Sequence, residues 1–374
     1  MKKRIRLLYA DTGGGHRSAA EAILQGLRMQ TGDRYDIALL NAFNMLPFPF
    51  KGAEETYPIW VNYARMVYGL GFHATNGRRR VVAMRRAIEP LADSVADEFL
   101  RVHPADLYIS CHPGYNMAVP DAIRRNGNAA RFVNVVTDLV SGHVAAFNPL
   151  TDHCIVPTEE ARRQAIENMV PPERVSVCGQ PVWPDFRQRM GNRAETRAAL
   201  KLREDLPMVL MMSGGDGMGT LGPNARELAF SGLPMQLVVV TGRNKAVKAE
   251  LEFINARVPT TILGFVRNVP ELMGAADILC TKAGPGTISE AFIAGLPILL
   301  FDRVPGQEEG NVDYVVNQGA GAWCPTPFAL TRTLRQWLAY PARLTGLRAA
   351  SASLARPNSA IDIARVALSY LPDE

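Results

Sequence analysis

Two glycine-rich turns, far apart in the chain, have residue types that could bind phosphate and move a proton. The first is Asp11 to His16, in the order Asp-Thr-Gly-Gly-Gly-His, and the second is Gly284 to Thr287, in the order Gly-Pro-Gly-Thr. Each turn follows an apolar run and precedes a helical pattern. A strand, a glycine turn and a helix direct unpaired backbone N–H groups and a helix dipole at one point, which suits an anion such as phosphate.

His16 and Asp11 are the candidates for proton transfer. Histidine is a common general base because its pKa lies near 7, and a positioned base contributes about 10²–10⁴-fold to a rate. We nominate His16 as the base, with Asp11 as its partner or its rival. The alternatives are a phosphate or helix-capping contact for His16 and loop-structuring hydrogen bonds for Asp11.

The residues around the second turn could bind a nucleotide sugar. Glu290 lies in the first turns of the following helix, where its carboxylate could accept a hydrogen bond from a ribose hydroxyl. The loop at residues 305–311 contains Gln307 and Glu308, and it is rich in the hydrogen-bonding groups that a sugar requires. The alternative interpretation is an ordinary α/β turn with a solvated loop.

Strand and helix patterns alternate along the chain, and they must position these residues. Apolar runs at 5–10, 35–40, 106–111, 132–137, 152–157 and 175–178 predict strands, and the pattern restarts at 207–212, 236–240, 261–265, 276–280 and 297–301. This alternation predicts two doubly wound, Rossmann-like α/β domains that face each other across a cleft. We place an N-terminal domain at 1–185, a C-terminal domain at 186–355, and a last helix at 356–374 that packs back on the N-terminal domain.

Composition limits the class of protein. The 374 residues are 47% hydrophobic and 21% charged, as in an ordinary globular enzyme, and the formal net charge is +5. This charge favours an acidic surface or an anionic ligand. The five cysteines are scattered, without a C-x-x-C pair, so we expect reduced thiols. No apolar run approaches the roughly 18 residues of a spanning helix, so we expect a cytosolic protein, soluble or attached to a membrane face.

The segment 42–105 differs from the rest of the chain. It is rich in aromatic and apolar residues, and residues 56–88 hold six arginines without any Asp or Glu. Apolar side chains beside a basic cluster are typical of an interfacial membrane contact. We nominate Phe48, Trp60, Arg78, Arg79 and Arg80 for this contact. The alternative is a core-packing insertion with a solvated, arginine-rich helix.

Several ordered motifs resemble one glycosyltransferase family. TKAGPGTISEA, GLPI and PGQEEGN resemble the C-terminal half of the monogalactosyldiacylglycerol synthases. These enzymes belong to glycosyltransferase family 28, together with the peptidoglycan N-acetylglucosaminyltransferase. DTGGGHRSAAEAI resembles the N-terminal signature of the family, and the loop at 213–219 resembles its Gly-Gly-Gly-Glu-Gly-Met-Gly loop, with Asp216 in the acidic place. VVTDL also resembles a family segment, but the usual His-Pro-x-Trp continuation is replaced here by a run from His143 to Phe147.

The resemblance implies the GT-B architecture and a UDP-sugar donor. It implies that the turn at Gly284 to Thr287 meets the diphosphate, that Glu290 binds the ribose, and that Gln307 and Glu308 hold the sugar. The expected donor-binding residues are Gly14, Gly15, Ser213, Gly214, Gly215, Gly217, Arg243, Phe265, Val266, Lys282, Ala283, Gly284, Pro285, Gly286, Thr287, Glu290, Gln307, Glu308 and Asn311. His143 joins the membrane and acceptor residues named above.

We expect no cofactor and no required metal ion, because the chain contains no Asp-x-Asp motif. Backbone N–H groups, helix N-termini and basic side chains would then stabilise the leaving UDP. The resemblance favours an inverting transferase that moves a hexose, preferably galactose, from UDP-hexose to diacylglycerol at the cytoplasmic face of a membrane. Anionic lipids are expected partners, and nucleic acid is not.

Three alternatives remain open. The donor could be UDP-glucose, the acceptor could be another lipid or a polyprenyl-linked sugar, or the chain could be a non-catalytic protein that binds a sugar nucleotide or anionic lipid. A binding protein has no need for Asp11 and His16 together. Protein partners and the oligomeric state do not follow from these patterns.

Overall fold

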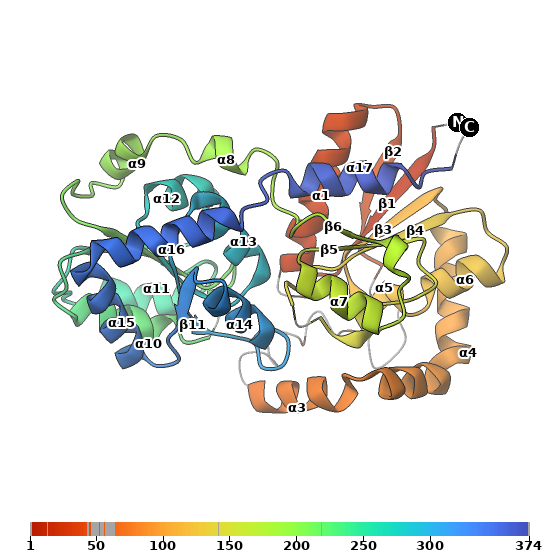
Figure 1. Cartoon of the computed structure of the whole chain (residues 1–374), viewed down its shortest axis with the longest axis horizontal. Coiled ribbons are helices and arrows are strands. Elements are labelled where there is room, and N and C mark those ends of the chain that lie inside the picture. The colour runs from red at the N-terminus through yellow and green to blue at the C-terminus, as the bar shows by residue number, and fades with distance from the viewer. Residues whose placement is uncertain are drawn as a thin grey trace. The chain divides into compact units, whose positions relative to one another are not determined.

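The computed structural model describes residues 2–12, 14–42, 45, 52, 56, 64–140, 142–217 and 219–372. The chain forms two compact units, which are described separately (Figure 1). The first unit comprises Met1–Pro184, Pro305–Gln307 and Asn358–Glu374, and the second comprises Asp185–Val304 and Glu308–Pro357. The proposed membrane residues Phe48 and Trp60 lie outside the described residues.

The first unit is built on a six-stranded parallel sheet with the strand order β2-β1-β3-β4-β5-β6. The strands are β1 Arg4–Leu8, β2 Asp36–Leu40, β3 Leu107–Ser110, β4 Arg131–Val135, β5 His153–Val156 and β6 Val175–Val177. Strands buried on both faces read as continuous apolar runs, which is why the sequence pattern locates them. Because β1 has β2 on one side and β3 on the other, the direction of winding reverses between β1 and β3.

The helices of the first unit cover both faces of this sheet (Figure 1). They are α1 Gly15–Thr31, α3 Arg65–Thr75, α4 Arg78–Val102, α5 Pro113–Asn116, α6 Val119–Arg125, α7 Glu159–Glu167 and α17 Ser359–Leu368, with short 3-10 turns η2 Val144–Ala146 and η3 Pro172–Arg174. Buried side chains of β1, β3, β4 and β5 form one core with α1 and α17.

The second unit repeats the plan with the strand order β12-β11-β10-β7-β8-β9, again all parallel. The strands are β7 Met208–Met212, β8 Gln236–Val240, β9 Thr260–Leu263, β10 Ile278–Lys282, β11 Ile298–Asp302 and β12 Gly321–Trp323. The winding here reverses between β7 and β10. The helices are α8 Phe186–Arg189, α9 Arg193–Ala199, α10 Leu221–Phe230, α11 Lys245–Glu252, α12 Val269–Ala275, α13 Pro285–Ala294, α14 Glu309–Asn317, α15 Pro327–Ala339 and α16 Pro341–Ser353.

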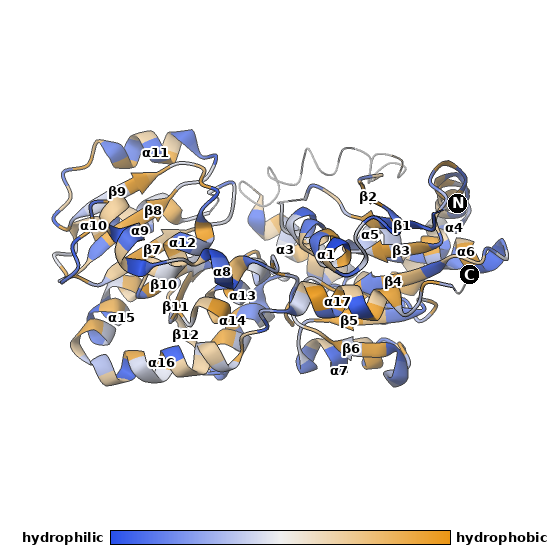
Figure 2. Ribbon diagram, turned by 90° about the horizontal axis from the view of Figure 1, so that it is seen from above, coloured by the Kyte–Doolittle hydropathy of each residue, from blue (hydrophilic) through white to orange (hydrophobic). Residues whose placement is uncertain are grey.

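The predicted pair of doubly wound α/β domains is therefore confirmed. Figure 2 shows β8 as a hydrophobic strand and the outer side of α11 as hydrophilic, which is the pattern of a sheet enclosed by amphipathic helices. Ligands of such sheets bind beyond the carboxyl ends of the strands at the reversal point. In each unit, a predicted glycine turn lies at that edge.

The last helix, α17, packs tightly along α1. A Cβ atom on Gly26 of α1 would lie 2.6 Å from the backbone oxygen of Ala360 in α17. We expect Gly26→Ala to destabilise the protein by about 1–3 kcal/mol, because the two helices must separate to admit a methyl group. The control is Gly346→Ala in α16, where no atom lies within 4 Å of the added Cβ. That change is expected to stabilise by about 0.5–1 kcal/mol. Urea unfolding measures both, and equal effects of the two changes would contradict this packing.

Candidate active site

The N-terminal glycine turn connects β1 to α1 at the reversal point of the first sheet. Gly14, with a φ of 77°, precedes the first residue of α1, and no side chain caps this helix. Nothing lies within 4 Å of a Cβ built on Gly14 or Gly15, so the backbone there is open to approach. An uncapped helix N-terminus with open glycines is suited to an anion.

His16, in the first turn of α1, is held by the two neighbouring strands. Its Nδ1 lies 2.8 Å from the carbonyl oxygen of Cys111, which follows β3, and 3.0 Å from Oγ1 of Thr137, which follows β4. The rings of His16 and His112 meet edge to face, with centroids 4.6 Å apart. Burial lowers the pKa of His16 to about 4, so the imidazole is neutral at pH 7 and can accept a proton.

Asp11 has a different environment from His16. Its carboxylate pairs with Arg17 at 3.4 Å, and the Asp11 side chain is 40% exposed. The groups that contact Nδ1 of His16 are Cys111 and Thr137, so Asp11 is not the residue that orients this nitrogen.

In the second unit, two loops meet through their backbones at the edge of the sheet. The loop after β7 contains Ser213, Gly214, Gly215 and Gly217, and the loop after β8 contains Gly242. A Cβ on Gly217 would collide with the carbonyl of Thr241, and one on Gly242 would collide with that of Gly215. Both glycines also have positive φ, so only glycine fits this close approach.

The turn after β10 forms the N-terminus of α13. Gly284 is the N-cap without a side-chain cap, Pro285 is the first helical residue, and the space beside Gly286 is open. Thr287 is half-buried beside them, whereas Ala283 is buried. The first N–H groups of α13 are therefore placed to meet an anion.

Lys282 lies between the two glycine turns of the second unit. Its Cε is 3.8 Å from a Cβ position on Gly214, and its Nζ is 3.4 Å from one on Gly284. The ammonium pairs with Oε1 of Glu308 at 2.5 Å, and the other oxygen of Glu308 accepts from the N–H of Val304 at 2.8 Å. The pair is largely buried, with 17% of the Lys282 side chain and 5% of the Glu308 side chain exposed.

The other predicted donor residues make contacts of their own. Asn311 is buried and donates to the carbonyl of Ala283 at 2.9 Å. Arg243 pairs with Asp216 at 3.0 Å and lies over the ring of Phe265, 4.7 Å from its centroid. Phe265 is 52% exposed and Val266 follows it. Gln307 lies between β11 and α14, in the short Pro305–Gln307 segment that belongs to the first unit.

Glu290, in α13, has a carboxyl group whose pKa is raised to about 7 by burial. Because the folded pKa lies above the ordinary value of 4.5, the stability contributed by this group is complete below about pH 4.5 and is lost as the pH rises through about 7. We therefore expect Glu290→Gln to gain thermal stability relative to the native protein between about pH 6 and pH 8. Melting temperatures measured across this range test the effect. Glu227→Gln, on the exposed side of α10, is the control. If the melting temperatures of the native protein and of Glu290→Gln depend on pH in the same way, the raised pKa of Glu290 is contradicted.

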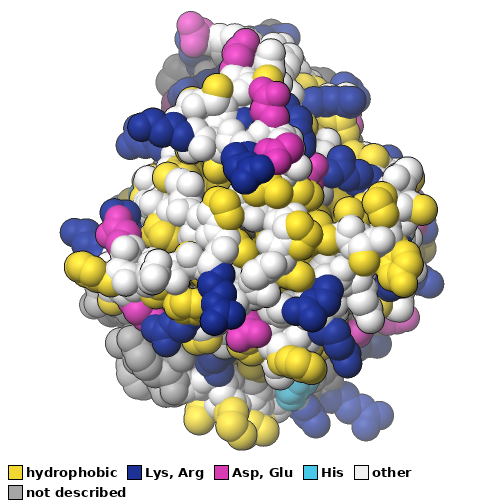
Figure 3. Space-filling model, turned by 90° about the vertical axis from the view of Figure 1, so that its left-hand side faces the viewer, with side chains coloured by type: hydrophobic (Ala, Val, Ile, Leu, Met, Phe, Trp, Pro, Cys, Tyr) yellow, Lys and Arg dark blue, Asp and Glu magenta, His cyan; other side chains and the backbone are white. Residues whose placement is uncertain are grey.

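The three predicted membrane arginines lie on α4, and exposed apolar residues that were not nominated lie on the preceding helix α3. Arg78, Arg79 and Arg80 begin α4 and are exposed. Met66, Val67 and Leu70 of α3 are 81%, 58% and 68% exposed. We call these six residues the α3–α4 surface. Figure 3 shows hydrophobic side chains at the lower edge of the view, over α3, with basic side chains beside them.

His143 lies near this surface and is half-buried. Its Nε2 is 3.1 Å from Oγ1 of Thr75, and its Nδ1 accepts from the N–H of Ala145 at 3.1 Å. Burial lowers its pKa. The ring is thus fixed at the start of η2 by contacts on both nitrogens.

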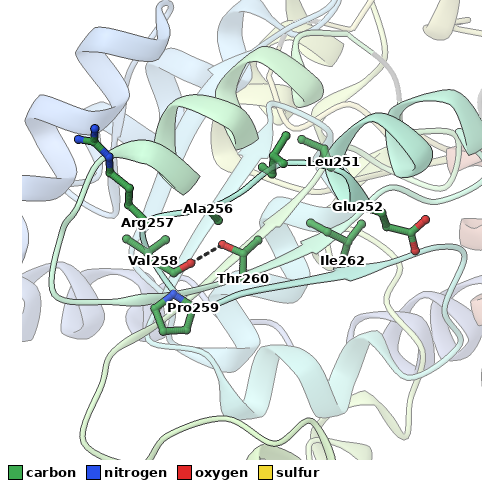
Figure 4. A pocket seen from close by; sticks show the side chains of 9 residues that line it. Leu251, Glu252, Ala256, Arg257, Val258, Pro259, Thr260 and Ile262 are labelled. Atoms are coloured by element: carbon green, nitrogen blue, oxygen red, sulfur yellow. Dashed lines mark hydrogen bonds between the residues drawn. The ribbon is translucent and has the colours of Figure 1, made fainter.

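A hollow of about 550 Å³ lies elsewhere in the second unit, between the end of α11 and the edge strand β9 (Figure 4). None of the predicted site residues lines it. Within the described residues, no cluster of three or more His, Cys, Asp or Glu side chains could hold a metal ion. Among the helices that the structure describes, none combines the length and the hydrophobicity needed to cross a membrane.

Sequence comparisons identify the family. Residues 16–182 match the monogalactosyldiacylglycerol (MGDG) synthase family, and residues 222–339 match the glycosyltransferase family 28 C-terminal domain. A probable chloroplastic monogalactosyldiacylglycerol synthase from Nicotiana tabacum is 35% identical, over 96% of this chain and 69% of its own length. The chain belongs to the monogalactosyldiacylglycerol synthase family. The chloroplastic synthase from Spinacia oleracea is 36% identical over 90% of this chain, which spans 66% of that relative.

Solved structures show that this MGDG synthase family member has the GT-B fold. MurG from Acinetobacter baumannii superposes with a TM-score of 0.62 at 15% identity, covering 98% of this chain and 99% of that one. UDP-GlcNAc 2-epimerase from Neisseria meningitidis, bound to UDP-GlcNAc, gives a TM-score of 0.63 at 13% identity, covering 98% and 100%. The predicted fold class is confirmed.

Three groups at the N-terminal site were not predicted as functional: the Cys111 carbonyl, Thr137 and His112. Cys111 and His112 follow β3, which is next to β1, and Thr137 follows β4, which is next to β3, so all three lie at the edge of the Asp11 to His16 turn. The signal that could have found them is their position just after β3 and β4, because the carboxyl ends of parallel strands meet at one edge.

Proposed function

We propose that this chain transfers a galactosyl group from UDP-galactose to the free hydroxyl of diacylglycerol, with inversion at the anomeric carbon. The observation that carries the proposal is His16, a neutral imidazole at the reversal point of a sheet in a member of the MGDG synthase family. In the reaction, the acceptor O–H gives its proton to Nε2 of His16 as its oxygen bonds to C1 of the sugar. The bond from C1 to the phosphate oxygen breaks, and UDP leaves with that electron pair.

We assign the donor to the second unit. The diphosphate binds at the N-terminus of α13 and beside Lys282, the ribose binds to Glu290, and Glu308 contacts the sugar. The support is the uncapped helix N-terminus and an ammonium group between two glycine turns. We expect the reaction to need no divalent metal, since the chain has no Asp-x-Asp motif and these groups can stabilise the leaving charge.

We assign the acceptor to the first unit, which we propose attaches peripherally to the cytoplasmic face of a membrane through the α3–α4 surface. Exposed Met66, Val67 and Leu70 could enter the lipid interface, and Arg78 to Arg80 could bind anionic headgroups.

Replacing the three arginines of the α3–α4 surface by Gln is expected to weaken binding to anionic vesicles. Each basic residue near such a surface contributes about 1 kcal/mol, so the loss of three lowers the partition coefficient roughly 100-fold. Co-sedimentation with phosphatidylglycerol vesicles at physiological salt measures this partition coefficient. The matched control is Arg332, Arg335 and Arg343 to Gln, which removes equal charge from exposed positions of α15 and α16. If both triple variants bind equally, the α3–α4 surface is not the docking face.

The function is tested by supplying diacylglycerol vesicles with tritiated UDP-galactose or UDP-glucose and separating the lipid products by thin-layer chromatography. We expect one galactosyl lipid, with a β-linkage in its NMR spectrum. A glucosyl product would correct the donor. An α-linkage would exclude single displacement, and the absence of any labelled lipid would refute the proposal.

A further inference from the structure

Two oxygen atoms contact one ring nitrogen of His16 and thereby define where its proton lies. Nδ1 is 2.8 Å from the carbonyl oxygen of Cys111 and 3.0 Å from Oγ1 of Thr137. A carbonyl oxygen has no hydrogen to donate, so a contact of this length requires Nδ1 to carry the proton. In the neutral ring, Nε2 then holds the lone pair.

We infer that Thr137 is a positioning residue for His16, which together with the Cys111 carbonyl fixes the imidazole in the Nδ1–H tautomer and leaves Nε2 as the proton acceptor. The catalytic meaning of this arrangement rests on the proposed glycosyl transfer. The tautomer itself is a property of the folded protein without substrate.

The two acceptors are held by the sheet rather than by a mobile loop. Cys111 is 1% exposed, and its N–H donates to the carbonyl of Leu8 in β1 at 2.9 Å. Thr137 is 6% exposed, and the N–H of the preceding Val136 donates to Ile155 in β5 at 2.8 Å. The strands β1, β3 and β4 are adjacent in the sheet. His16 comes after β1, and the Cys111 carbonyl and Thr137, which orient its ring, come after β3 and β4.

His112 restricts the ring further. Its plane is 77° from that of His16, with the ring centroids 4.6 Å apart, so His16 cannot rotate freely about its Cβ–Cγ bond. The Nδ1 of His112 accepts from the N–H of Gly114 at 3.1 Å, so in the neutral ring its proton is on Nε2.

Neither group at Nδ1 of His16 is a carboxylate, unlike the aspartate of a Ser-His-Asp triad. As Nε2 takes a proton, both contacts at Nδ1 become charge-assisted hydrogen bonds to neutral oxygens. Loss of the Thr137 hydroxyl should therefore affect the step in which the imidazolium forms more than it affects donor binding.

The tautomer is measured on the ligand-free protein labelled with ¹⁵N-histidine, by two-bond ¹H–¹⁵N correlation spectra near pH 7. The spectrum of His16→Asn assigns the His16 signals by their disappearance. We expect a protonated Nδ1 and a bare Nε2. The opposite tautomer would overturn the inference even in an active protein, whereas the expected tautomer in a protein that transfers no sugar would leave it standing and refute the proposed function.

Three threonine variants test the positioning role. Thr137→Val removes the hydroxyl at nearly constant shape, and we expect kcat to fall about 10- to 100-fold with an unchanged KM for the donor. Thr137→Ser restores an oxygen and should recover kcat to within about threefold of the native value. The control is Thr151→Val, a fully buried threonine that donates to Asn148 and should leave kcat unchanged. Thr137→Val with the native kcat, or a loss confined to KM, would remove Thr137 from this role.

Discussion

Replacing His16 by Asn is expected to lower kcat by about 10²- to 10⁴-fold, the usual contribution of a positioned general base. Asn is the sharpest choice because its amide N–H₂ can still donate to the Cys111 carbonyl and Thr137 from the place of Nδ1, while nothing replaces Nε2. The donor KM should change little, because the lost interaction belongs to the transition state. Initial rates at saturating acceptor, with varied donor, measure both constants.

The matched control is His153→Asn, in β5 of the same unit. His153 contacts Ser176 through Nε2 and Tyr370 through Nδ1, at 2.8 and 2.7 Å, so its role in the structure is to join the segment after α17 to the sheet. We expect this variant to lose stability and to keep kcat. A His16→Asn enzyme as fast as the native one would exclude His16 as the base and return Asp11 to consideration.

Replacing Lys282 by Met is expected to have the largest effect on the second unit. It leaves the Glu308 carboxylate, which is only 5% exposed, without its counter-charge, and a broken buried pair costs about 3–5 kcal/mol of stability. It also removes the ammonium proposed to bind the diphosphate. The loss of a hydrogen bond to a charged group corresponds to a fall in kcat/KM of about 10- to 100-fold.

A double variant separates these two effects. Lys282→Met combined with Glu308→Gln leaves no unpaired charge, so most of the stability should return while kcat/KM stays low. Lys248→Met is the control, because it breaks an exposed pair with Glu252 in α11 that is worth about 0–1 kcal/mol. Urea unfolding and donor kinetics on the four proteins measure the outcome. Native donor kinetics in Lys282→Met would show that this residue only supports the fold.

Local pattern predicts the strands β1 to β11 and the glycine turns, but it does not predict the three-residue edge strand β12 at Gly321–Trp323. A buried parallel strand appears in the sequence as an apolar run, and the turn after it is rich in glycine. The segments around His16 and Gly284 could therefore be located from the sequence alone. Both sheets and their doubly wound topology follow from this alternation.

Contacts between residues far apart in the chain could not be predicted in this way. Thr137 is 121 positions from His16, and only the adjacency of β1, β3 and β4 brings the two together. Lys282 and Glu308 are 26 positions apart, and their pairing depends on how the loop after β11 folds over the end of β10. The membrane contact stays a prediction: Arg78 to Arg80 are exposed, which fits both a membrane contact and a solvated helix, and Phe48 and Trp60 lie outside the described residues.

The central claim is direct hexosyl transfer from UDP-galactose to diacylglycerol with backbone N–H groups and Lys282 in place of a metal ion. The most direct measurement is the initial rate of galactosyl lipid formation after the protein and substrates have been treated with EDTA. We expect a rate equal to that without EDTA, and one that added magnesium or manganese does not raise. Loss of transfer in EDTA and its recovery with a divalent cation would contradict the claim.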